Sequence, residues 1–184
     1  MNIHINPTPG NAAAVMDGSA LQNEALQLER KGDLVGAERA FLQALQVKEA
    51  GLGADAVSTA LSCNGLGELY LKMGRLDQAE HYLNRALNVR SHAGPAADLA
   101  VTRDNLGRLY EAKGDLKAAR EIREQGAPDN IACSNYNCPR MSNKLSNMSR
   151  CSACKAPVYC TRTCQAADWK RHKKFCKRTT SADV

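Results

Sequence analysis

Apolar residues recur at steps of three and four positions through residues 18–126, which is the period of a helix that buries one face. Three segments within this stretch align with one another around a glycine, and these glycines are spaced 42 and 40 residues apart. The segments are ERKGDLVGAERAFLQAL, LKMGRLDQAEHYLNRAL and EAKGDLKAAREIREQG. A fixed period of this length is typical of stacked structural repeats. The pattern therefore predicts an all-α helical-repeat solenoid.

The pattern within each repeat predicts two antiparallel helices that are joined at the glycine. Gly32, Gly74 and Gly114 stand where the first helix ends and a left-handed residue is needed. A leucine and an alanine follow each glycine at constant distances: Leu34, Leu76 and Leu116, then Ala37, Ala79 and Ala119. One such hairpin cannot bury its apolar face alone, so neighbouring hairpins are expected to stack.

The segment before the glycine is also repeated, because GLGELYLKMG matches NLGRLYEAKG. With this LG..Y motif and the alanine pattern downstream, residues 18–126 resemble tetratricopeptide repeats. The long period is more similar to the variant of kinesin light chains, with extra loop at EAGLGADA and HAGPAAD. The first copy lacks the motif's Gly and Tyr, and the third departs from the pattern at Arg123 and Gly126. We interpret both copies as capping units whose polar substitutions suit the ends of a stack.

The resemblance also implies a concave groove that is open to peptides. Asn64, Arg103 and Asn105 fall on the first helices of their repeats and are candidates to line it. Cys63 lies among apolar positions of a helix, so we expect it to be a small buried core residue.

The helical pattern ends at EQGAPDNIAC, and the charge of the chain changes there too. Residues 1–130 hold 14 Lys and Arg against 17 Asp and Glu, a net charge of −3, whereas residues 131–184 hold 11 against 2, a net charge of +9. Such asymmetry predicts two modules with different roles. We place a linker at residues 127–132, a zinc module at 133–176 and a tail at 177–184.

The first 17 residues contain no lysine or arginine and no apolar run of signal-peptide type, and we expect residues 1–17 to be disordered. No apolar run approaches the roughly 18 residues that span a bilayer. The expected compartment is the cytoplasm and/or the nucleus, where clustered cysteines are metal ligands more often than disulfides.

Seven of the eight cysteines follow residue 132 and, together with one histidine, form four close pairs. The eight residues are Cys133, Cys138, Cys151, Cys154, Cys160, Cys164, His172 and Cys176. Eight such donors fill two tetrahedral sites, which is the geometry of closed structural zinc. A module this small also has too few apolar residues for a core of its own. The spacing therefore predicts a small irregular domain held by two zinc ions, although it leaves open whether the pairs combine in an interleaved or a consecutive order.

The run CSACKAPVYCTRTCQAADWKRHKKFC resembles the MYND-type zinc finger, with its C-x2-C-x5-C-x3-C-x7-H-x3-C spacing and its CQ…DW signature. Upstream, Cys133 and Cys138 are four residues apart, more than is usual in that family. The resemblance implies interleaved ligands: Cys133, Cys138, Cys160 and Cys164 for one zinc, and Cys151, Cys154, His172 and Cys176 for the other. It also implies that Gln165 and Trp169 border a groove for proline-containing peptides. The competing interpretation is that Trp169 only packs the small core.

A C-terminal helix over residues 164–178 would separate ligands from charges. At roughly 100° per residue its cysteines and histidine share one face, and the lysines and arginines of KRHKKFCKR form a basic arc that faces water. Gln165 and Trp169 are one turn apart at the edge of the metal face.

These features favour an interaction adaptor with protein partners and no membrane, in which a helical-repeat platform is joined to a peptide-binding zinc finger. An enzyme is disfavoured, because the zinc sites have no open position and only Cys63 is left as a free thiol. The alternative is a nucleic-acid-associated or transcriptional regulatory protein that uses the basic helix.

Overall fold

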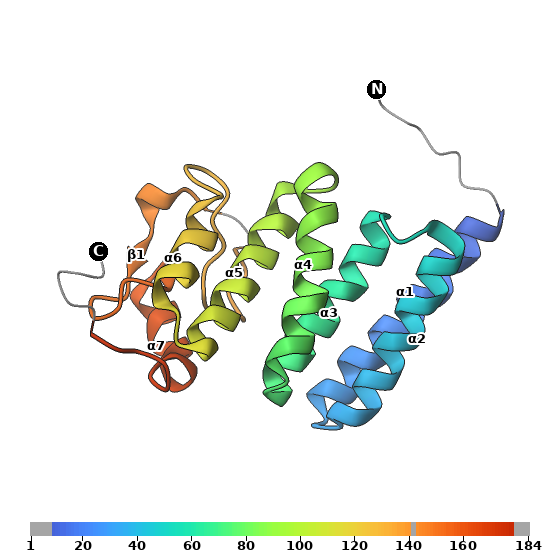
Figure 1. Cartoon of the computed structure of the whole chain (residues 1–184), viewed down its shortest axis with the longest axis horizontal. Helices are drawn as coiled ribbons and strands as arrows, with labels where there is room; N and C mark the ends of the chain where they lie inside the picture. The colour runs from blue at the N-terminus through green and yellow to red at the C-terminus, as the bar shows by residue number, and fades with distance from the viewer. Residues whose placement is uncertain (1–8, 141–142, 179–184) are drawn as a thin grey trace.

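The computed structural model describes residues 9–140 and 143–178. Residues 9–124 form helical hairpins that are stacked side by side along the length of the molecule, with α1 and α2 at one end and the cysteine-rich module at the other (Figure 1). The hairpins pair α1 (Pro9–Arg30) with α2 (Leu34–Leu52), α3 (Val57–Met73) with α4 (Leu76–His92), and α5 (Ala96–Lys113) with α6 (Leu116–Glu124). The predicted helical-repeat solenoid is confirmed.

The glycine of each repeat ends the first helix as predicted. Gly32, Gly74 and Gly114 have φ values of 86°, 73° and 85°, in the left-handed region. The backbone N–H of the residue after the glycine donates a hydrogen bond to a carbonyl of the preceding helix, as from Asp115 N to Tyr110 O at 2.9 Å. Asp115 then caps α6, because its side chain accepts a hydrogen bond from Ala118 N at 2.8 Å. Each turn therefore satisfies backbone groups that the helix ends leave free.

The core lies between the helices, where small residues allow close approach. The repeated alanines Ala37, Ala79 and Ala119 have no exposed surface, and Leu83 is equally buried. A Cβ atom on Gly67 would lie 2.5 Å from Leu83, so only glycine fits where α4 crosses α3. Cys63 is 1% exposed within the same core, as predicted.

Helix boundaries differ from the prediction in two places. We expected residues 1–17 to be disordered, but α1 begins at Pro9, so residues 9–17 are helical; residues 1–8 lie outside the described residues. The extra length of the repeats was expected as loop, yet α2 continues to Leu52 and α5 begins at Ala96. Much of the extra length therefore lengthens helices.

The cysteine-rich module has little regular structure. A 3-10 turn (η1, Leu145–Asn147) leads into a hairpin of two short antiparallel strands, β1 (Ser149–Arg150) and β2 (Val158–Tyr159), with Ser149 opposite Tyr159. Helix α7 (Arg162–His172) follows. Thr161 caps α7 by accepting a hydrogen bond from Cys164 N at 3.1 Å. The module is thus an irregular domain with a C-terminal helix, as predicted.

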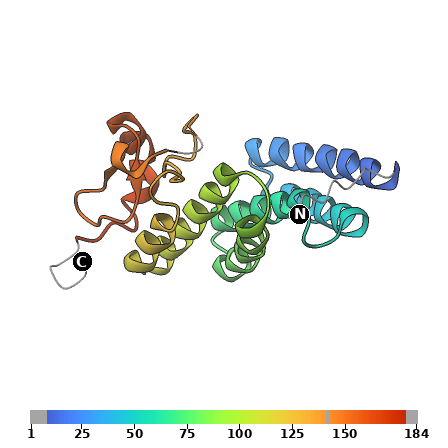
Figure 2. The same cartoon turned by 90° about the horizontal axis from the view of Figure 1, so that it is seen from above.

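The module packs against the last hairpin instead of hanging from a free linker. Residues 127–132 were expected to be a linker, but Ile131 and Ala132 are buried, and Ile131 forms a β-bridge with Asn143. Cys151 and Cys154 share an apolar cluster with Ala119 of α6. Seen from above (Figure 2), the module lies over the α5–α6 end of the solenoid. Among the described residues, no helix has the length and apolar character needed to cross a membrane.

Candidate metal centre

Two sets of four ligand atoms converge in the cysteine-rich module, each within 4.8 Å of one another. One set is Cys133, Cys138, Cys160 and Cys164, and the other is Cys151, Cys154, His172 and Cys176. This is the interleaved order that the MYND resemblance implies, not the consecutive order that spacing alone left open. Helix α7 serves both sets, with Cys164 in its first turn and His172 at its end. Eight residues of helix hold these two ligands about 12 Å apart along the axis.

The distances within each set fit tetrahedral zinc. With Zn–S bonds of about 2.3 Å, two sulfur ligands of one zinc lie about 3.8 Å apart. The Sγ atoms of Cys138 and Cys160 are 3.5 Å apart, those of Cys160 and Cys164 3.6 Å, and those of Cys151 and Cys176 3.8 Å. These separations far exceed a disulfide bond of about 2.05 Å. Each set therefore has the donors and the spacing to hold one zinc ion.

One thiol in each set is prepared to ionise. Burial raises the pKa of Cys151, but hydrogen bonds from backbone N–H groups of the same loop outweigh it and lower that pKa to about 7. At Cys164, hydrogen bonds from the side chains of Asn135 and Thr161 lower the pKa to about 7. Burial raises the pKa of Cys133 and Cys154. A bound cation would keep these thiols ionised, because the thiolate is the metal-binding form.

The histidine ligand is oriented by a carboxylate from the helical repeats. His172 Nε2 lies 3.3 Å from Cys154 Sγ, inside the ligand set, and Nδ1 lies 3.2 Å from Oε2 of Glu111 on α5. Metal-binding histidines commonly donate their second N–H to a carboxylate, which fixes the ring and raises its basicity. Glu111 is 1% exposed and His172 is 1% exposed, so water does not compete for this contact. The solenoid thus supplies an outer support for the zinc finger.

A buried network of ion pairs surrounds Glu111. Its two carboxylate oxygens meet Arg123 Nη2 at 2.7 Å and Arg171 Nη1 at 2.8 Å. Burial raises the pKa of Glu111, but these two guanidinium groups and His172 outweigh it and lower the pKa. Arg123 Nε also donates to Asp104 Oδ1 at 2.8 Å, and Ser134 Oγ donates to the same oxygen at 2.7 Å. Residues of α5, α6 and the finger are therefore joined through charged groups that are largely buried, with Arg171 at the edge of the network.

The position of Arg123 corrects the interpretation of the third repeat. We interpreted its polar substitutions as a solvent-facing cap, but Arg123 is 3% exposed. It occupies the slot that Leu83 fills one repeat earlier, because a Cβ on Gly107 would lie 2.5 Å from Arg123 just as one on Gly67 would from Leu83. From this slot Arg123 Nη1 donates to Ala156 O of the finger at 3.3 Å. The finger itself covers the end of the stack.

Asp168 of the QAADW segment holds the finger together from within. It is 6% exposed, and its Oδ2 accepts a hydrogen bond from the buried Tyr159 hydroxyl at 2.9 Å. Arg171 donates to both Asp168 oxygens, from Nε at 2.7 Å and from Nη2 at 2.6 Å. Strand β2 and helix α7 are thereby tied together between the two ligand sets. The Asp of the CQ…DW signature is thus the hydrogen-bond partner of the tyrosine in β2.

The C-terminal helix is shorter than predicted, and its charges are not one arc. Helix α7 ends at His172, so the prediction of a helix over residues 164–178 is wrong beyond that point. Cys176 reaches its ligand set from a turn in which its N–H donates to His172 O at 3.0 Å. Arg171 faces Asp168 and Glu111 instead of water. The basic segment is therefore divided between the interior and the surface.

Gln165 and Trp169 lie on the face of α7 that points away from the solenoid. They border a shallow depression of about 510 Å³, which is also lined by Arg162, Ala166 and the loop at 151–153. Trp169 is 47% exposed and packs its ring against that of His172, with ring centroids 6.0 Å apart. The indole therefore both contacts the metal centre and offers about half of its surface to solvent.

The three residues that were predicted to line a groove of the solenoid lie in different surroundings. Asn64 and Asn105 each line a surface pocket but are largely buried, 5% and 2% exposed, and both side chains donate to Oε1 of Glu68, at 2.9 and 2.6 Å. Arg103 lines no such surface; its guanidinium lies near Gly126 instead. It occupies the repeat position of Cys63, which faces the core.

Sequence reasoning missed Glu111, Asp104 and Asp168. The first two lie on a helix whose neighbours are polar as well, so nothing local marks them. One signal was available: Arg123 stands where the repeat pattern calls for a bulky apolar residue, and a charge in a core slot requires a buried partner.

Comparison with known proteins follows the same division of the chain. A tetratricopeptide-repeat model matches residues 18–92 and 64–127, and a MYND-finger model matches residues 133–176. Among solved structures, the crystal structure of BtubC (BKLC) from P. vanneervenii is similar, with a TM-score of 0.57 and 27% identity over 59% of this chain and 44% of that one.

Curated relatives match over short segments. SET domain-containing protein 14 from Caenorhabditis elegans is 42% identical over 40 residues, which is 22% of this chain and 9% of that protein. F-box protein At1g67340 from Arabidopsis thaliana is 47% identical over 45 residues, 24% of this chain and 12% of that protein. Histone-lysine N-methyltransferase ASHR1 from Arabidopsis thaliana is 43% identical over 37 residues, which is 20% of this chain and 8% of that protein. The chain thus spans about a tenth of the length of these relatives. It belongs to the tetratricopeptide-repeat proteins, with repeats like those of kinesin light chains, and it joins them to a zinc-binding MYND finger.

Proposed function

We propose that this protein is a non-enzymatic adaptor whose finger binds proline-containing segments of protein partners in the depression beside Gln165 and Trp169. Tetratricopeptide repeats and MYND fingers are interaction modules, which supports a role in protein–protein contacts. The observation that carries the finer proposal is the exposure of Trp169. A large aromatic side chain left 47% exposed on a zinc finger this small is available to a partner.

The chemistry of the depression suits proline. Proline-rich segments adopt an extended conformation in advance, and aromatic-lined grooves recognise them by stacking. Gln165, one turn before Trp169, offers an amide that can both donate to and accept from a peptide backbone. Because the ring of Trp169 packs on that of His172, a zinc ion bound by His172 would also help to fix the position of the indole.

The zinc sites themselves support a structural role. Each set already has four protein donors, so neither keeps the open position at which catalytic zinc activates water. Two of the relatives are a SET domain-containing protein and a histone-lysine methyltransferase by name, but the chain spans only 9% and 8% of them. The activity of those proteins is therefore not carried over.

The alternative of nucleic-acid binding has less support. Phosphate recognition needs several free cations along one surface. Arg171 is held by Glu111 and Asp168, so one cation of the run KRHKKFCKR is not free to meet a phosphate.

Titration of the intact, zinc-loaded protein with proline-containing peptides tests the proposal. Trp169 is the only tryptophan, so indole fluorescence reports on this depression directly. We expect Gln165→Ala to weaken binding. Trp169→Ala has no indole, so its binding is followed by the fluorescence anisotropy of a labelled peptide, and we expect it to be weaker by about 30-fold, the equivalent of about 2 kcal/mol for an aromatic anchor. Thr163→Ala, an exposed residue of the same helix outside the depression, is the matched control. If no proline-containing peptide binds in the micromolar range while zinc content is full, the proposal fails.

A further inference from the structure

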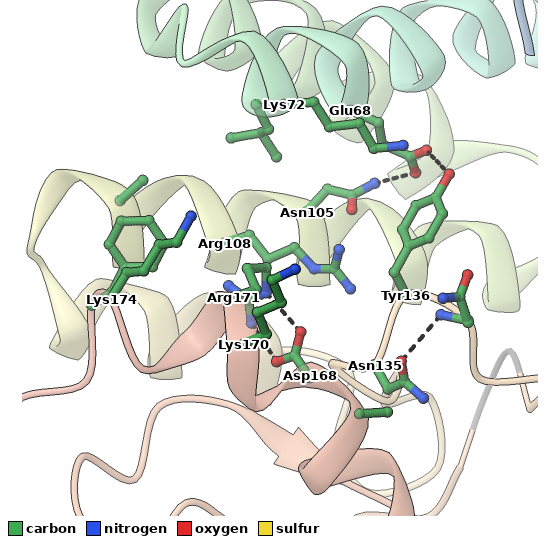
Figure 3. A pocket seen from close by; sticks show the side chains of 15 residues that line it. Glu68, Lys72, Asn105, Arg108, Asn135, Tyr136, Asp168, Lys170, Arg171 and Lys174 are labelled. Carbon is green, nitrogen blue, oxygen red and sulfur yellow. Dashed lines mark hydrogen bonds and ion pairs between the residues drawn. The ribbon is translucent and has the colours of Figure 1, made fainter. Parts of the chain in front are cut away.

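A second groove lies on the opposite side of α7, between the finger and the concave face of the solenoid. Its volume is about 490 Å³. Helices α3 and α5 supply six of its lining residues and the finger supplies nine, so neither module forms it alone. Figure 3 shows the side chains of the two modules facing one another across this space. Gln165 and Trp169 are not part of it.

Positive charge predominates in this groove. Five of the lining residues are cationic and two are carboxylates; the cations are Lys72, Arg108, Lys170, Arg171 and Lys174. Both carboxylates are already engaged. Glu68 accepts hydrogen bonds from Asn105 at 2.6 Å and from the Tyr136 hydroxyl at 3.1 Å, and Asp168 is held by Arg171 and Tyr159. The groove therefore offers more cationic groups than its own carboxylates neutralise.

Two of the cations are available to a ligand. Lys170 and Lys174 are exposed, and within residues 9–140 and 143–178 neither has an ion-pair partner. They are four residues apart and both line the groove, one from the last turn of α7 and one from the turn that follows it. The other three are occupied: Lys72 by Glu29, Arg108 by Asp104 and Arg171 by Glu111.

Tyr136 forms the wall that joins the two modules. Its ring lies between Lys72 and Arg108, with Lys72 Nζ 4.6 Å and Arg108 Cζ 5.4 Å from the ring centroid, and its hydroxyl reaches Glu68 on α3. These contacts hold an aromatic ring that is 46% exposed at the edge of the groove. Leu71, Ala112 and Phe175 add apolar surface to the lining. The groove thus combines free lysines with an apolar portion.

We propose that this groove binds a short acidic peptide segment of a partner protein, with its carboxylates at Lys170 and Lys174 and an apolar side chain among the apolar lining residues. Charge complementarity selects the sign of the ligand. A peptide suits the site better than a nucleic acid, because only two of the five cations are free to meet a row of phosphates, whereas the apolar lining can accept a side chain. The site lies on a different face of α7 from the proposed proline-binding depression, so one finger would contact two segments at once.

Fluorescence anisotropy of the intact, zinc-loaded protein tests the proposal with three labelled probes: an octapeptide of glutamates around two leucines, its lysine counterpart, and a single-stranded oligonucleotide of similar length. We expect only the glutamate peptide to bind tightly. The double variant Lys170→Glu with Lys174→Glu should weaken its binding about tenfold or more, because both free cations become repulsive. Lys173→Glu with Lys177→Glu is the matched control, since both residues are exposed, lie in the same segment and are outside the groove.

Three results would overturn the proposal. The first is that the glutamate peptide binds no more tightly than the lysine peptide. The second is that the two double variants weaken it equally, which would indicate general attraction to a basic protein. The third is tighter binding of the oligonucleotide that is lost in the Lys170 and Lys174 variant, which would assign the groove to nucleic acid instead.

Two further measurements complete the design. Zinc content and helical circular dichroism establish that each variant is folded. Gln165→Ala should leave binding of the glutamate peptide unchanged, which separates this site from the proline-binding depression.

Discussion

Removal of the Glu111 carboxylate is expected to damage both modules at once. Glu111 is fully buried and is the shared partner of Arg123, Arg171 and the zinc ligand His172. In Glu111→Ala, Arg123 loses a partner that it cannot replace with water, because its side chain is only 2% exposed. Breaking a buried pair in this way typically costs about 3–5 kcal/mol. Such a loss is a large share of the total of about 5–15 kcal/mol that stabilises a typical domain.

The zinc site should respond as well. Loss of the outer partner of a metal-binding histidine typically weakens metal binding about 10–100-fold. Glu111→Gln keeps the shape of the side chain and one acceptor oxygen, so we expect it to lower the free energy of unfolding and the zinc affinity less than Glu111→Ala does. Both quantities should therefore decrease in the order wild type, Glu111→Gln, Glu111→Ala. Glu121→Gln, an exposed position on α6, is the matched control and should change neither.

Two measurements on the same samples decide the matter. Urea denaturation followed by circular dichroism reports the free energy of unfolding, and competition with a zinc-binding dye reports metal affinity. Wild-type values for both in Glu111→Ala would refute the buried network as a source of stability. A loss of stability with unchanged zinc affinity would refute only the part of the reasoning that passes through His172.

Two further predictions concern the metal and the modules. Purified protein should contain two zinc ions per chain by elemental analysis. His172→Ala should lower this number towards one and unfold the finger, because zinc binding supplies much of the folding free energy of such domains. One zinc ion or none in a well-folded wild type would contradict the assignment of two donor sets. Residues 1–126 expressed alone should form α1–α4 but lose stability around α5 and α6, because Asp104, Glu111 and Arg123 lose the groups of the finger that complete their network. Amide hydrogen exchange measures this directly, and equal protection of α5 in the full chain and in residues 1–126 would be inconsistent with it.

The second of these predictions differs from what a repeat architecture alone would suggest. Repeat proteins are stabilised by contacts between neighbours, which favours independence. The sequence could not reveal that the finger acts as such a neighbour. Glu111 and His172 are 61 residues apart, and no periodicity links a carboxylate on a repeat helix to a ligand in an irregular domain.

What the sequence does predict well is local or periodic. The glycines at the hairpin turns require a left-handed conformation that few other residues adopt, so Gly32, Gly74 and Gly114 mark the turns reliably. The ligands are marked by their chemistry, since seven cysteines and a histidine in close pairs form the donor pattern of structural zinc. The end of α7 is the opposite case. The run after His172 contains neither glycine nor proline, so the change of direction that brings Cys176 to its ligand set has no local signal.

The position of the finger explains why a third repeat with a charged residue in its core slot is stable. The last hairpin of a solenoid normally needs a polar outer face, because no further repeat covers it. Here Ala119 of α6 packs on Cys151 and Cys154, and Arg123 reaches the backbone of Ala156. The finger therefore occupies the place of a fourth repeat, and its own fold depends on zinc. Because Lys170 and Tyr136 belong to the finger whereas Lys72 and Arg108 belong to the solenoid, we expect the groove between them to be lost when zinc is removed and the finger unfolds.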